Sequence, residues 1–162
     1  MKKYELLKDE TIEVCGRILY RIRALRDFGD VRAGDKGGYL ESEKNLSHEG
    51  KCWVSGNASV MDDALVYEDA QISEDGEVCG AARVFGNAEV YNDAQVSENA
   101  SVYDNARIYG GAVVSGNAQV FENAHVYGVA GVIGNAQVCG NSRFWNCTVM
   151  SSRYQQEPTA AT

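Results

Sequence analysis

Aliphatic, small and polar residues repeat every six positions from Cys52 to Arg153. One column of the repeat is apolar in every copy, and two positions earlier stands a residue no larger than Cys or Thr. Turn-forming pairs such as Gly56-Asn57 separate the copies. A unit this short buries its apolar side only by stacking on the next unit, so the pattern predicts a solenoid. The apolar column consists of Val54, Val60, Val66, Ile72, Val78, Val84, Val90, Val96, Val102, Ile108, Val114, Val120, Val126, Val132, Val138, Phe144 and Met150.

Each copy of the repeat predicts a strand of three or four residues followed by a corner. Asn and Gly tolerate the left-handed backbone that a sharp corner needs. Alternation along the strand sends the aliphatic residue inward and its two neighbours outward. We therefore expect an all-β protein whose core is a narrow column of mostly Val side chains.

The repeat resembles that of the hexapeptide-repeat family, whose fold is a left-handed parallel β-helix with three hexapeptides per coil. The left hand is implied by the resemblance alone, because parallel crossovers are usually right-handed. The seventeen hexapeptides of this chain would then form five to six coils. With layers ~4.8 Å apart, the prism would be roughly 27 Å long.

The outward residue after each apolar position is aromatic in two of the three phases of an eighteen-residue coil. We expect two ladders of stacked rings, which stabilise the exterior or a subunit interface, or which hold a planar ligand. One ladder is Tyr67, Phe85, Tyr103 and Phe121, and the other is Tyr91, Tyr109, Tyr127 and Trp145.

The chain divides into a predicted β cap over residues 1–51, the β-helix over 52–153 and a flexible tail over 154–162, all within one structural domain. Short strands are expected at 2–7, 11–14 and 17–25. The cap would cover the first coil and its unpaired backbone edge. The glycine-rich run Gly34 to Gly38 lacks the Gly-Lys-Ser/Thr ending of a phosphate loop.

The cap carries a more specific motif than the repeat. It contains Asp27-Phe28-Gly29-Asp30-Val31-Arg32-Ala33-Gly34-Asp35-Lys36-Gly37-Gly38, then Asn45-Leu46-Ser47 and Cys52-Trp53. This is similar to the N-terminal region of YdcK-like proteins of bacterial phages and prophages. The resemblance implies a phage or prophage origin, and the link of that family to acyltransferases rests mainly on the fold.

The composition of the chain limits the classes of molecule that it is expected to bind. The net charge of −8 argues against general DNA or RNA binding, which needs a broad basic surface. No signal peptide or long apolar segment is present, so we expect a cytoplasmic protein that does not bind membranes. The five cysteines show no CxxC spacing, which favours reduced thiols over disulfides or zinc. The acidic corners lack calcium-binding spacing and predict a solvated rim, so no metal site is expected.

Two histidines are available as a general base for acyl transfer. His48 lies where the cap meets the repeat and is expected to support a turn. His125 lies between Ala124 and Val126 and points outward, a position such a base can occupy. The enzymes of the hexapeptide-repeat family usually have a loop that interrupts the repeats and builds an acceptor pocket, and this chain has none.

The surroundings of His125 predict a ligand site. In steps of eighteen its outward column is Trp53, Gln71, Glu89, Arg107, His125 and Arg143, beside the second aromatic ladder. Stacking combined with Arg contacts holds nucleobases and phosphates. The alternative is that both arginines pair with acidic residues of a partner subunit. The candidate ligand-binding residues are Arg107, Tyr109, His125, Tyr127, Arg143 and Trp145.

We expect a non-enzymatic, phage-type homotrimer without a cofactor, which evades host defence by sequestering a small anionic nucleotide or by docking to a host protein. One alternative is an acyltransferase that uses a coenzyme A thioester and His125 as its base. The other is a structural phage component.

Overall fold

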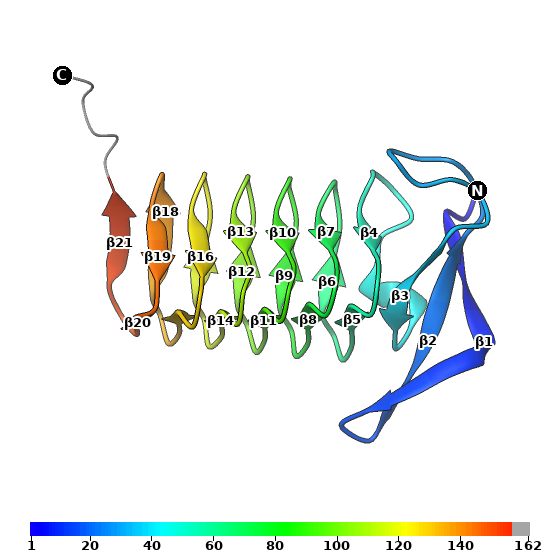
Figure 1. The fold of residues 1–162 in the computed structure, drawn as a ribbon, viewed down its shortest axis with the longest axis horizontal. Helices are drawn as coiled ribbons and strands as arrows, with labels where there is room; N and C mark the ends of the chain where they lie inside the picture. Colours follow the sequence, from blue (N-terminus) through cyan, green and yellow to red (C-terminus); the bar gives the residue numbers. More distant parts are fainter. Residues whose placement is uncertain (157–162) are drawn as a thin grey trace.

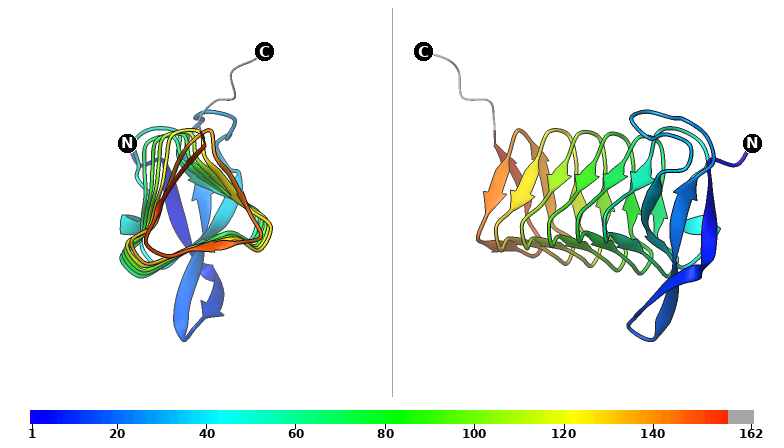
Figure 2. Two further views of the ribbon diagram at one scale, coloured as in Figure 1. Left: turned by 90° about the vertical axis from the view of Figure 1, so that its left-hand side faces the viewer. Right: turned by 45° about the vertical axis from the view of Figure 1, so that its right-hand side comes forward.

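Short strands of the repeat stack in parallel on the strands three places away in the chain, in a computed structural model that describes residues 1–156. The pairing joins residues eighteen apart, such as Glu89 with Arg107, as far as β19, and the offset falls to seventeen at β20 and sixteen at β21. Six turns of the solenoid result, each with three sides (Figures 1 and 2). The predicted all-β, parallel solenoid with three repeats per coil is confirmed.

Three sheets form the sides of the prism. One consists of β4 (Trp53–Val54), β7 (Gln71–Ile72), β10 (Glu89–Val90), β13 (Arg107–Ile108), β16 (His125–Tyr127) and β19 (Arg143–Trp145). The second consists of β6 (Leu65–Val66), β9 (Arg83–Val84), β12 (Ser101–Val102), β15 (Gln119–Val120), β18 (Gln137–Gly140) and β21 (Arg153–Gln156). The third contains β5 (Ser59–Val60), β8 (Glu77–Val78), β11 (Gln95–Val96), β14 (Val113–Val114), β17 (Gly131–Val132) and β20 (Thr148–Val149), and three cap strands extend it.

The core is the predicted aliphatic column. Its members from Val54 to Phe144 are at most 5% exposed. Met150 was predicted as the last member, and this is wrong, because its exposed fraction is 62%. Val149 takes the core position and pairs with Val132, since the corner between β19 and β20 is one residue shorter than the corners of the earlier coils.

Corner residues adopt the left-handed backbone, and several are acidic rather than glycine. Their side chains are not only a solvated rim. The Asp62 carboxylate accepts a hydrogen bond from the N–H of Gly80 at 3.0 Å, and the Glu68 carboxylate accepts one from the N–H of Gly86 at 2.7 Å. A corner carboxylate that accepts such a bond therefore fastens one coil to the next.

The cap is built around a β-hairpin whose end projects beyond the outline of the coils (Figures 1 and 2). β1 (Tyr4–Val14) pairs with β2 (Arg17–Ala24), which pairs with β3 (Lys36–Leu40), and a one-turn 3-10 helix, η1 (Glu43–Asn45), follows. The strands expected at 2–7 and 11–14 form one strand with a register shift between Leu7 and Thr11. β3 pairs in parallel with β5, so the cap continues one side of the prism.

The C-terminal boundary differs from the prediction. β21 pairs with β18 as far as Gln156, so residues 154–156 belong to the solenoid and not to a tail. The rest of the predicted tail, 157–162, lies outside the described residues. No helix in residues 1–156 is long and apolar enough to cross a membrane.

Candidate functional site

The predicted basic column lies in register on adjacent strands. Glu89 pairs with Arg107, Arg107 with His125, and His125 with Arg143. Both arginines are exposed and His125 is half-buried. The first member of the column differs, because Trp53 is only 4% exposed and packs edge-on against Phe28 of the cap at 5.3 Å. The accessible column therefore lies away from the cap.

The aromatic ladder next to this column is confirmed. Ring centroids are 5.0 Å apart between Tyr91 and Tyr109, and 5.1 Å apart between Tyr109 and Tyr127. Trp145 ends the ladder, 6.5 Å from Tyr127, and is 57% exposed. Because inner rings cover each other's faces, only the end rings Tyr91 and Trp145 keep a face that no other ring of the ladder covers, and Trp145 is the more exposed of the two.

His125 is held at the edge of the ladder. Its Nδ1 lies 3.4 Å from the hydroxyl oxygen of Tyr109, and the two rings meet edge-on. Burial lowers the pKa of His125 below its ordinary value, and the positive charges of Arg143 and then Arg107 lower it further. His125 is thus neutral at pH 7, and the permanent charge of this face comes from the arginines.

The two arginines differ in their surroundings. Arg107 places its Nε 3.6 Å from a carboxylate oxygen of Glu89, on the neighbouring strand of the same chain. Within residues 1–156, Arg143 forms no ion pair. It stands on β19 two residues before Trp145, so both side chains leave the same face of one strand. Arg143 is therefore the cation of this face that is available to a ligand.

The other predicted ladder lies on the β6–β21 side and is also confirmed. Its centroids are 4.8, 5.0 and 5.1 Å apart, with planes within 5° of parallel. Its last ring, Phe121, lies under the guanidinium of Arg153 at 6.0 Å. The last ring of the Tyr67–Phe121 ladder is thus covered, unlike Trp145 at the end of the other ladder.

Hollows in the surface lie at the opposite end of the prism. One of about 610 Å³ is lined by Ser47, Glu49, Gly50, Tyr67, Glu68, Asp69, Gly86 and Asn87. Another, of about 370 Å³, is lined by Arg17, Glu41, Lys44, Asp62, Asp63 and Gly80. No candidate ligand-binding residue lines either hollow. Carboxylates in both hollows disfavour an anion, so the exposed end of the Tyr91–Trp145 ladder is the better candidate for an anion site.

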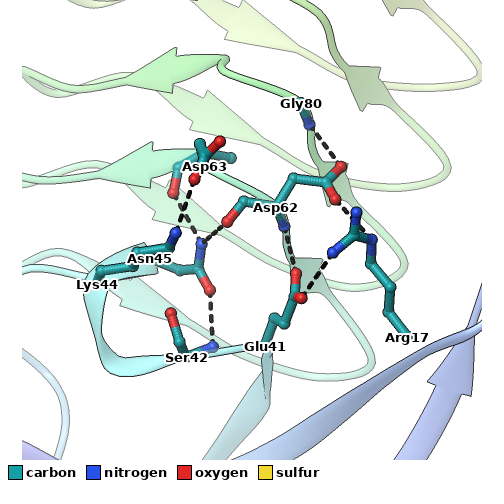
Figure 3. Close-up of polar contacts among 9 residues, drawn as sticks. Arg17, Glu41, Ser42, Lys44, Asn45, Asp62, Asp63 and Gly80 are labelled. Atoms are coloured by element: carbon teal, nitrogen blue, oxygen red, sulfur yellow. Dashed lines mark hydrogen bonds and ion pairs between the residues drawn. The ribbon is translucent and has the colours of Figure 1, made fainter.

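The second hollow contains a polar network that sequence reasoning missed. Figure 3 shows Arg17 reaching from the hairpin to Glu41 and Asp62, at 2.8 and 2.7 Å. Lys44 pairs with Asp63 beside them at 2.7 Å. These contacts fasten the hairpin and η1 to the first coils. The sequence pattern did not predict them, because the paired residues lie far apart in the chain and at least one member of each pair lies outside the repeat.

His48 has a structural role, as predicted. Its Nδ1 accepts the backbone N–H of Lys3 at 3.1 Å, and its ring stacks on Tyr4 at 4.3 Å. The contacts hold the start of the cap against the turn before the first repeat. No group of three or more metal-ligating side chains occurs in the described part of the chain.

Comparison with known proteins gives one family. The family model of the YdcK beta solenoid repeat matches residues 100–116, which hold β12, β13 and β14 and so about one coil. No curated protein matches the chain.

Proposed function

Since the chain is a parallel β-solenoid repeat protein of the YdcK type, we propose that it acts by binding a small planar anion at the C-terminal end of its second aromatic ladder. The observation that carries the proposal is the position of Arg143, which forms no ion pair within residues 1–156, beside the exposed ring of Trp145. A nucleotide combines the two groups that such a pair recognises, a base that stacks and a phosphate that accepts Arg hydrogen bonds.

The six candidate residues then have unequal roles. Trp145 stacks on the base and Arg143 holds the phosphate. His125, neutral and in register with Arg143, offers a hydrogen-bonding group. Tyr127 stacks against Trp145, and Tyr109 stacks against Tyr127, so both hold the Trp145 ring in place. Arg107 attracts the anion through its positive charge.

The biological role that fits best is sequestration of a nucleotide signal. The phage resemblance of the cap supports a setting in which a host's defence signal is removed by occupancy rather than by chemistry. Docking to a host protein through the same face is the second version. A structural role in the phage particle remains a third, and detection of the protein in purified virions would favour it.

Calorimetry with cyclic dinucleotides and with adenine and guanine mononucleotides tests the proposal. We expect heat of binding from at least one of them, and a loss of affinity of at least about tenfold in Arg143→Ala and in Trp145→Ala. Arg83→Ala is the matched control, because Arg83 is also an exposed strand arginine next to an aromatic ladder. No heat from any nucleotide would leave only the protein-docking version.

We further propose a homotrimer in which the binding face becomes a cleft shared by two chains. Large apolar side chains are exposed near the C-terminal coils, with Val129 at 75% and Met150 at 62%. Such exposure marks an association surface, and closed three-fold symmetry lets one side of a prism meet a different side of the next. A monomer mass in light scattering at micromolar concentration would eliminate the shared cleft.

A second candidate is acyl transfer from coenzyme A, with His125 as the base. The lowered pKa of His125 favours it, because a neutral imidazole accepts a proton at pH 7. Coenzyme A should then raise the melting temperature, and His125→Ala should abolish thioester turnover without unfolding the protein. Failure to bind coenzyme A at millimolar concentration would eliminate this function.

A further inference from the structure

A lysine and a cysteine are buried together where the cap meets the first coil. Lys3 and Cys52 each have an exposed fraction of 0%. The Nζ of Lys3 lies 3.2 Å from the Sγ of Cys52, and it also donates to the backbone oxygen of Cys52 at 2.8 Å. The two residues lie 49 positions apart in the chain. Their contact therefore joins the start of the cap to the start of the solenoid.

The contacts of Lys3 are unusual for a buried lysine. Buried ammonium groups are normally paired with a carboxylate. Among residues 1–156, Lys3 instead contacts backbone oxygens of Glu49 and Cys52, the thiol, and the ring of Phe28 at 4.9 Å. An amine and a thiol are thus held in contact with no acid between them.

We propose that Lys3 and Cys52 form a covalent S–N cross-link when the protein meets a peroxide, and that this bond locks the cap onto the solenoid. First, the thiol of Cys52 reacts with the peroxide: the O–O bond breaks, sulfur takes one oxygen as a sulfenic acid, and water leaves. The Nζ of Lys3 then attacks the sulfur, the S–O bond breaks, and the hydroxyl leaves with an amine proton as a second water. Sulfur is oxidised by two electrons, and the peroxide is reduced to water.

The surroundings affect the two steps differently. Burial lowers the pKa of Lys3, which supplies the neutral amine that the second step needs. Burial raises the pKa of the Cys52 thiol, and the charge of Lys3 opposes this rise only in part, so the reaction of the thiol with peroxide is the slower step. The flexible stem of lysine allows the short movement that bond formation needs.

The peroxide has a route to the buried thiol. The Sγ of Cys52 lies 3.5 Å from the backbone oxygen of Ser47 and 3.6 Å from that of Glu49. Both residues also line the hollow of about 610 Å³. One turn of chain thus separates the thiol from solvent, and local opening of that turn admits a small oxidant.

Peptide mapping of the full-length protein tests the cross-link. The protein is treated with hydrogen peroxide, quenched with catalase, denatured, alkylated and cut after glutamate. We expect residues 1–5 joined to residues 50–68, with a mass about 2 Da below the sum of the two reduced peptides, and we expect dithiothreitol to separate them. Cys52 recovered as a free thiol, as a disulfide or as a sulfinic acid, without joined peptides, would overturn the proposal.

Two comparisons make the test specific. Lys3→Arg keeps the positive charge but removes the primary amine, so the joined peptide should disappear. Cys139 is an internal control: it is equally buried and touches the Nε of Arg153 at 3.3 Å, but a guanidinium is a poor nucleophile. Peptides joined through Cys139 to the same extent would show unselective oxidation and would also overturn the proposal.

The lock should also be visible in stability. A bond that closes a loop of this length should raise the thermal midpoint of the oxidised protein by about 5–10 °C. The increase should vanish after reduction and be absent in Lys3→Arg. An oxidised protein that contains the joined peptide but melts as before would show that the bond does not lock the cap. This inference does not depend on the proposed ligand site.

Discussion

Single residues decide how closely the cap approaches the first coil. A Cβ at Gly37 would lie 2.4 Å from the backbone oxygen of Val54, and one at Gly38 would lie 2.4 Å from that of Ala58. Neither glycine has a positive φ, so lack of space is the reason for glycine at both positions. Gly37 and Gly38 thus belong to a closely packed strand, whereas Gly34 lies in the turn before it and has a positive φ.

Gly37→Ala should therefore destabilise the protein by about 2–4 kcal/mol, because the backbone of β3 must move away from the first coil. The matched control is Gly111→Ala, where the added Cβ meets only the backbone oxygen of Gly128 at an ordinary 3.5 Å. Urea unfolding of both variants measures the difference. Equal effects would contradict the close approach of β3.

His125 should make stability depend on pH. Its native pKa lies below the ordinary 6.5 because of burial and the charges of Arg143 and Arg107, with Glu89 opposing. Just below pH 6.5 the unfolded chain binds more protons than the native one. The stability present above pH 6.5 is therefore lost as the pH falls through the native pKa.

Thermal midpoints measured between pH 7.5 and pH 5 check this expectation. The midpoint of the wild-type protein should fall more than that of His125→Gln, which cannot take up the proton. Arg143→Gln should show an intermediate fall, since one of the opposing charges is gone. Identical profiles for all three proteins would show that His125 is not desolvated.

At the scale of elements, stacking on neighbours in both directions stabilises the strands. Phe85 stacks on Tyr67 and on Tyr103, whereas Tyr67 stacks only on Phe85 within its ladder. Amide ladders add to this at the corners, as between Asn105 and Asn123 at 3.3 Å. The contribution of a side chain should thus depend on its place along the prism.

Phe85→Leu should cost about 0.5–1.5 kcal/mol more than Tyr67→Leu, the value of one additional aromatic pair. Denaturant unfolding of the two variants gives the comparison, and the double variant shows how much of the cost is shared. A larger cost at Tyr67 would mean that contacts outside the ladder dominate.

The whole molecule has one end covered by the cap and one end formed by the last coil (Figure 1). At the last coil, β19, β20 and β21 each pair with a single strand. Phe144 stays buried there, but Val149 is only partly buried and packs against the core. Stability in such a solenoid is a sum of coils and of the interfaces between them.

Amide hydrogen exchange should therefore be fastest in β19, β20 and β21 and slowest in the central coils around β10 to β14. Phe144→Ala should speed exchange in the last coil and leave the central coils almost unchanged, because each coil contacts only its neighbours. Mass spectrometry of exchanged peptides measures this. Uniform protection along the prism would contradict it.

The sequence determined the solenoid because its period is short and its contacts are local to the repeat. Once eighteen residues make a coil, the core column, both aromatic ladders and the register of Arg107, His125 and Arg143 follow from counting. Counting in steps of six failed at Met150. The corner before β20 lacks one residue, and because side chains along a strand alternate between core and solvent, this shift places Val149 in the core and Met150 in solvent.

Only the tertiary structure decided the contacts that cross the repeat or leave it. It covered Trp53 with the cap, paired Arg17 with Asp62, and buried Lys3 against Cys52. It also showed that the inner rings of the ladder cover each other and leave the face of Trp145 exposed. A periodic pattern specifies which residues share a column, whereas burial, charge pairing and free faces depend on what packs against that column from elsewhere in the chain.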